Sequence, residues 1–80
     1  MSGWVKVDEV STYTTDKYIA VVSGFENENL DMIYDYAILT NDANYDVVWS
    51  SDRDSGINYY FSEKDAKEKA IGTLVNLLMG

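Results

Sequence analysis

The sequence predicts an α+β domain: a small antiparallel meander of four to five strands, covered on one face by one C-terminal α-helix. Residues 1–61 contain short runs rich in β-branched and aromatic residues, separated by turn-forming residues. A stripe of apolar residues at helical spacing follows Ser62. No proline interrupts either pattern. Eighty residues are enough for one domain, 1–80, with a modest core.

Turn chemistry separates the expected strands. Residues 25–31 form a polar, acidic loop, residues 41–44 (Asn-Asp-Ala-Asn) a turn, and residues 51–56 a second turn. The run 32–40 has the clearest strand character. The expected strands are 4–10, 17–23, 32–40, 45–50 and 57–61.

The C-terminal helix has a clear start signal. Ser62 is a good N-cap, and Asp65 stands three residues later, as in an acidic variant of the capping box. Gly72 costs about 1 kcal/mol relative to alanine in a helix, so it marks either close packing or a tolerated defect. The apolar stripe consists of Ala66, Ala70, Ile71, Leu74, Leu77 and Leu78.

The second face of the sheet bears on function. Alternation along 32–40 places two different sets of side chains on opposite faces, and one helix can cover only one of them. The uncovered face is then a dimer or partner surface, unless loops and the N-terminal segment fold over it. The two sets are Met32, Tyr34, Tyr36 and Ile38, and Ile33, Asp35, Ala37 and Leu39.

Charge narrows the class of partner. Fourteen acidic residues against six basic ones give a net charge of −8. In residues 1–61 the only bases are Lys6, Lys17 and Arg53, so the excess lies before the helix. Such a field repels nucleic acid and membrane surfaces and attracts basic protein surfaces.

Composition argues against catalysis. The chain has no cysteine and no histidine, which removes thiol chemistry and the commonest general base. Asp42, Asn44 and Asp46 begin like a calcium loop, but Val47 replaces the required glycine and Arg53 the bidentate glutamate. We therefore expect a turn there, no metal or cofactor, and no enzyme. Nothing resembles a signal peptide, so we expect a cytoplasmic protein, in the bacterial host cytoplasm if it is viral.

Two local resemblances involve nucleic-acid biology. The last helix resembles that of double-stranded-RNA-binding domains at Ser62, Lys64, Ala66, Lys67 and Ala70, a family in which these lysines grip phosphates. Residues 19–49 resemble the central strands of the phage uracil-DNA glycosylase inhibitors. The shared features are the turn at 23–26 and the spacing of Leu39, Thr40, Asp42, Ala43 and Trp49. The second resemblance implies an inhibitor that imitates nucleic acid.

These observations favour a small acidic inhibitor encoded by a phage or mobile element. It would bind the basic nucleic-acid surface of a host defence or DNA-processing enzyme, such as a CRISPR effector or a restriction enzyme. The alternative is a non-enzymatic interaction module or a β-sheet homodimer without mimicry. The residues expected to contact the partner are Glu26, Glu28, Asp31, Asp35, Asp42, Asp46, Asp52 and Asp54, with Tyr34 and Tyr36.

Overall fold

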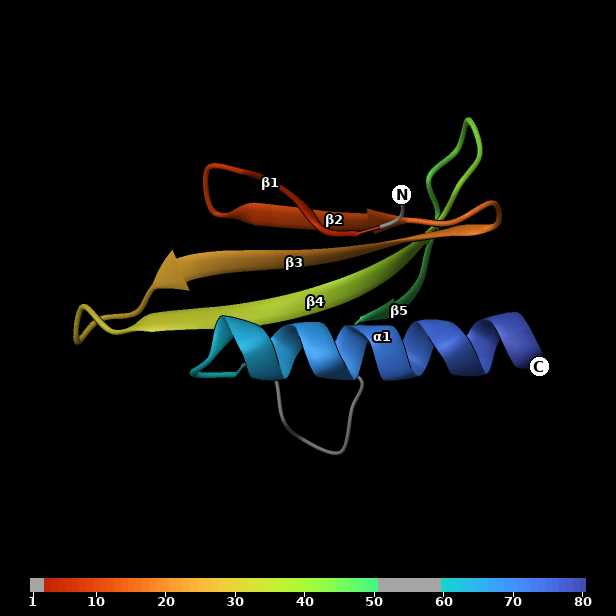
Figure 1. The fold of residues 1–80 in the computed structure, drawn as a ribbon. Coiled ribbons are helices and arrows are strands. Elements are labelled where there is room, and N and C mark those ends of the chain that lie inside the picture. The colour runs from red at the N-terminus through yellow and green to blue at the C-terminus, as the bar shows by residue number, and fades with distance from the viewer. Residues whose placement is uncertain (1–2, 51–59) are drawn as a thin grey trace.

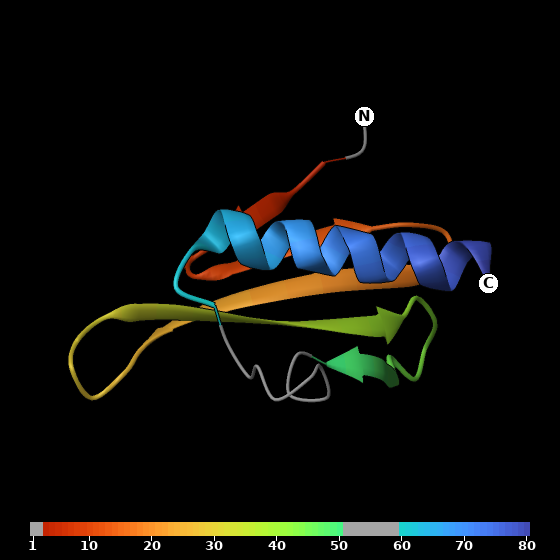
Figure 2. The ribbon, with the colours of Figure 1, turned by 90° about the horizontal axis from the view of Figure 1, so that it is seen from below.

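The predicted fold class is confirmed. The computed structural model describes residues 3–50 and 60–80 and consists of a five-stranded antiparallel sheet, in the order β1-β2-β3-β4-β5, followed by one helix, α1 (Figure 1). The helix lies across one face of the sheet, where it contacts β3 and β4 (Figure 2). The elements are β1 (Val5–Val7), β2 (Val10–Thr14), β3 (Tyr18–Glu26), β4 (Met32–Thr40), β5 (Val47–Ser50) and α1 (Glu63–Met79).

The N-terminal strand prediction was wrong in one respect. The run 4–10 is not a single strand, because a turn at Asp8 and Glu9 folds β1 back onto β2, with Val7 opposite Val10. Asp8 has a φ of 55°, which Asp tolerates better than most residues. The Ser/Thr-rich stretch that follows is therefore strand β2. The predicted turn 51–56 and most of the predicted strand 57–61 lie outside the described residues.

The centre of the sheet is the long β3–β4 hairpin. Both strands have nine residues, and their register is continuous from Tyr18 opposite Thr40 to Glu26 opposite Met32. Strand β3 thus runs three residues beyond the predicted end at Ser23. At the far edge, Tyr60 exchanges two backbone hydrogen bonds with Tyr34, of 2.6 and 2.7 Å.

The helix begins as its sequence predicts and packs through Ala66, Ala70 and Leu74 of the predicted stripe, whereas Leu78 is 42% exposed. The Ser62 hydroxyl accepts a hydrogen bond from the Asp65 backbone N–H at 3.4 Å. The alanines of the stripe bring the helix close to the sheet, because they add little side-chain bulk between the two layers. A Cβ built on Gly72 would meet nothing within 4 Å, so this glycine is a tolerated defect and not a packing requirement. The core of the helix-facing side comprises Ala20, Val22, Tyr36, Ile38, Ala66, Ala70 and Leu74.

A network of hydrogen bonds connects the helix to strands β4 and β5. Trp49 Nε1 donates a hydrogen bond to the Tyr36 hydroxyl at 3.0 Å, and that hydroxyl lies 3.0 Å from Thr73 Oγ1. Since Tyr36 is only 2% exposed, its hydroxyl needs partners within the protein. The network therefore joins β4, β5 and α1 through one side chain.

Candidate partner-binding surface

The meander sorts the acidic residues into two groups, because its turns alternate between opposite ends of the sheet (Figure 1). We call these groups the β3–β4 end and the β4–β5 end. The β3–β4 end carries Asp8, Glu9, Glu26, Glu28 and Asp31, and the β4–β5 end carries Asp16, Asp42 and Asp46. All eight residues are exposed.

The distance between the ends follows from the strands that join them. The nine residues of β3 and of β4 are joined by eight steps of about 3.4 Å, which separate the two turns by about 27 Å. This is more than three times the screening length of about 8 Å at physiological salt. The two ends are therefore electrostatically independent sites held on one rigid sheet.

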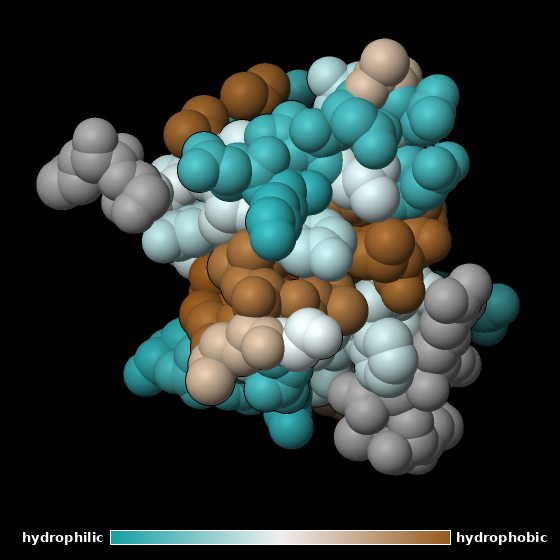
Figure 3. Space-filling model, turned by 90° about the vertical axis from the view of Figure 1, so that its right-hand side faces the viewer, coloured by the Kyte–Doolittle hydropathy of each residue, from teal (hydrophilic) through white to brown (hydrophobic). Residues whose placement is uncertain are grey.

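Within the part of the chain that the structure describes, acidic residues outnumber basic ones at both ends. Among the described residues, the acids of the two ends form no ion pair, whereas Glu63 of α1 pairs with both Lys6 and Lys67. Lys17 is the described base in the turns of the β4–β5 end, and the last turn of α1 carries no basic residue. Figure 3, which looks onto the β4–β5 end, shows hydrophilic residues across its upper part and a band of hydrophobic residues below them. Among the described residues, both ends thus present an excess of negative charge to solvent.

The loop at the β4–β5 end forms the predicted turn. Asp42 Oδ1 accepts hydrogen bonds from the backbone N–H groups of Asn44 and Tyr45 and from the Thr40 hydroxyl, at 2.9 to 3.1 Å. The Asn44 N–H, followed by the Thr40 hydroxyl, lowers the pKa of Asp42. The hydrogen bonds of the turn therefore favour the ionised form of Asp42. Within the described part of the chain, no three acidic side chains come together as a metal site.

The turn at the β3–β4 end is ordered in a similar way. Asn27 Oδ1 accepts hydrogen bonds from the backbone N–H groups of Asn29 and Asp31, at 2.9 and 3.0 Å. Leu30 adopts a φ of 65°, and its N–H donates to the Asn27 carbonyl. The exposed side chains of Glu28 and Asp31 therefore project from a constrained backbone. Preorganised charges of this kind lose little entropy when they bind a partner.

The tyrosines predicted to contact a partner lie on the helix-facing side of the sheet. Tyr36 is buried beneath α1, and Tyr34 is partly buried over Gly24. Asp35, between them, belongs to the opposite face by strand alternation. Asp52 and Asp54 lie outside the described residues. The structure thus brings Glu26, Glu28 and Asp31 together, and Asp42 and Asp46 together, but not the two groups.

The face of the sheet opposite α1, which we call the outer face, was predicted only in part. The register places Val5, Val7, Val10, Val21, Phe25 and Val47 on it. The sequence identifies only the β4 residues of this face, because it predicts one strand over 4–10 and a loop at Phe25. Counting every second residue from Ile19 places Val21 and Phe25 on one face if the strand continues to residue 25.

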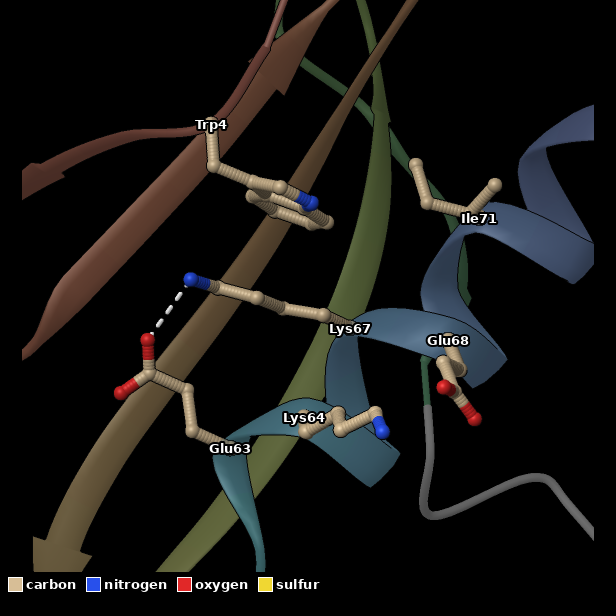
Figure 4. Close-up of a pocket in the computed structure, with 6 residues that line it drawn as sticks. All are labelled: Trp4, Glu63, Lys64, Lys67, Glu68 and Ile71. Carbon is tan, nitrogen blue, oxygen red and sulfur yellow. Dashed lines mark ion pairs between the residues drawn. The ribbon is translucent and has the colours of Figure 1, made fainter.

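A groove lies between the N-terminal segment and α1. It has a volume of about 490 Å³ and is lined by Trp4, Glu63, Lys64, Lys67, Glu68 and Ile71 (Figure 4). Lys67 extends beneath the Trp4 ring, with Nζ 5.3 Å from the ring centroid and 2.7 Å from Glu63. Lys67, followed by Lys6, lowers the pKa of Glu63. These contacts attach the edge strand to the first turn of the helix.

Comparison of the chain with protein-family models, with curated proteins and with solved structures gave no match. The resemblances to double-stranded-RNA-binding domains and to uracil-DNA glycosylase inhibitors therefore stay predictions. Within the described residues, no helix has both the length and the apolar character needed to cross a membrane.

Proposed function

We propose that this protein is a small acidic inhibitor that binds the nucleic-acid-binding surface of an enzyme. A phage or a mobile element is the source we favour, and a host defence or DNA-processing enzyme, such as a CRISPR effector or a restriction enzyme, is the target. The observation that carries the proposal is the presence of two groups of exposed carboxylates that form no ion pair among the described residues and lie about 27 Å apart on one sheet. A basic channel that holds a nucleic acid attracts such a surface by the same steering that attracts its substrate.

Charge density sets a limit on mimicry. A duplex about 27 Å long carries about sixteen phosphate charges, whereas the whole protein has a net charge of −8. The protein therefore matches roughly half the charge of the nucleic acid that it would displace. Competition at ordinary salt requires a further source of affinity besides the carboxylates.

The test is inhibition of purified enzymes. A panel of nucleases, DNA glycosylases and CRISPR effectors would be assayed on their own DNA or RNA substrates with increasing inhibitor. We expect inhibition of at least one enzyme, relieved by excess nucleic acid and weakened by raising salt from 0.05 to about 0.5 M, because salt screens exposed charge pairs.

Three single charge reversals locate the contact. Glu28→Lys tests the β3–β4 end, Asp46→Lys tests the β4–β5 end, and Glu68→Lys on the exposed side of α1 is the charge-matched control. Because the ends act independently, the losses from Glu28→Lys and Asp46→Lys should multiply in the double variant. Inhibition that is indifferent to salt and equally affected by all three reversals would refute the proposal.

A further inference from the structure

The outer face is an apolar surface that no layer formed by residues 3–50 or 60–80 covers. Fifteen positions of the five strands share it by register, and ten of them are apolar. Ile33, opposite Phe25, is buried, but several large neighbours are between 42% and 67% exposed. These exposed residues are Val5, Val7, Val10, Phe25 and Val47.

The helix leaves this face open. Because α1 packs against the Tyr36 and Ile38 side of the sheet, alternation directs the other side chains of β4 away from it. Figures 1 and 2 show no described helix or strand over the outer face. A sheet with one uncovered apolar face normally buries it against another layer.

The size of the face is suited to a partner element. Four strand spacings of about 4.8 Å and a length of about 27 Å give at most about 500 Å². A standard interface buries about 800 Å² on each partner. The outer face supplies most of that area, and the acidic ends that flank it can supply the rest.

Charge decides which occupant fits. The eight described acids of the two ends border the face, and Asp35 lies within it. A second copy would bring one net charge of −8 against another, which opposes association. A partner with basic side chains on both sides of an apolar centre would complement the apolar face and both ends.

We infer that the outer face is the docking surface for an amphipathic segment of the target protein, apolar along its centre and basic at both ends. This inference rests on the proposed function for the class of target. Apolar contacts on the outer face would add the binding free energy that the protein lacks because it carries only about half the charge of a duplex. A helix of about eighteen residues spans about 27 Å. It would cover the outer face as α1 covers the other.

The test uses a defined probe and the whole protein. The probe is a synthetic eighteen-residue helical peptide with a leucine stripe along its centre and two lysines at each end. The control peptide has the same composition with the leucines and lysines scrambled. Both are titrated against the protein while backbone amide chemical shifts are recorded, and sedimentation gives the oligomeric state of the free protein.

We expect the striped peptide to bind at least tenfold more tightly than the scrambled one, with shift changes concentrated in β1, β2 and β3. Val7→Thr with Val10→Thr, which are register partners, should weaken binding about tenfold. The control is Val75→Thr on α1, because Val75 is 43% exposed and Val10 42%. The control should stay within twofold of the unmodified protein.

Each other outcome overturns the inference. Equal binding of the two peptides would show attraction by charge alone, and failure of both to bind would show that the face is inert. A dimer dissolved by Val7→Thr with Val10→Thr would assign the face to a second copy. The proposed function fails separately: if no enzyme is inhibited while the striped peptide still binds the outer face, only the class of target is wrong.

Discussion

The ring of Tyr34 occupies the space above Gly24, its partner across the β3–β4 hairpin. A Cβ at Gly24 would lie 2.8 Å from Cε1 and 3.0 Å from Cδ1 of that ring. Both distances are shorter than van der Waals contact, so the ring and a side chain at position 24 exclude each other. The glycine permits an aromatic side chain to cover the backbone of β3 beside the start of α1.

Gly24→Ala should therefore destabilise the protein by about 1–3 kcal/mol, the usual cost of overpacking. Its matched control is Gly72→Ala, which adds the same methyl group where nothing lies within 4 Å. We expect Gly72→Ala to stabilise by about 0.5–1 kcal/mol, through helix propensity. Urea unfolding of both variants measures the difference, and two changes of the same sign would contradict the packing described for Tyr34.

Tyr36→Phe tests the polar network beneath the helix. The variant keeps the ring but removes the acceptor for Trp49 Nε1 and the partner of Thr73. We expect a loss of about 1–3 kcal/mol, because a polar group left buried without a partner is costly. Thermal unfolding measures the loss, and the indole N–H resonance of Trp49 should shift. An unchanged resonance would mean that the hydrogen bond does not form in solution.

Leu74→Ala tests the seating of the helix on the sheet. Leu74 is 2% exposed within the core cluster, so its truncation should cost about 2–5 kcal/mol. Leu78→Ala is the control on the same helix, because Leu78 is 42% exposed, and it should cost well under half as much. A melting temperature unchanged in the Leu74 variant would argue against helix-on-sheet packing.

Acid should weaken the attachment of β1 to α1. Lys67, followed by Lys6, lowers the pKa of Glu63 in the folded state. The ion pairs therefore stabilise the fold above the pKa of Glu63 in the unfolded chain, about 4.3. This stabilisation is lost as pH falls through the lower pKa of the folded state. The pKa of Lys6 shifts in the opposite direction, because its hydrogen bond to Glu63 raises it. The stabilisation that charged Lys6 provides is therefore lost as pH rises through this pKa.

The measurement is the free energy of unfolding from pH 7 to pH 3, for the unmodified protein and for Glu63→Gln. Protonation also relieves repulsion among the other acids, so the difference between the two curves isolates Glu63. We expect this difference to shrink as pH falls below about 4.3. A constant difference over that range would show that the ion pairs contribute nothing to stability.

The sequence alone determined the elements whose signals are local. The strand 32–40 and the N-cap at Ser62 were predicted correctly, because alternation and capping depend on neighbouring residues. It also determined that one helix leaves one face of the sheet uncovered, because a single helix cannot cover both faces. The turn at Asp8 and Glu9 was missed, since a positive φ at a residue other than glycine has only a weak sequence signal.

Only the tertiary structure decided which face the helix covers. Both faces of β4 are largely apolar, so their composition does not choose between them. Alanines on α1 and Gly24 on β3 make room for the bulky Tyr34 and Tyr36, and the Tyr36 hydroxyl finds its partners Trp49 and Thr73 on that side. This choice buries Tyr36 and part of Tyr34, and it leaves the outer face between the two acidic ends. Such an arrangement depends on register and packing between distant segments, which no local pattern encodes.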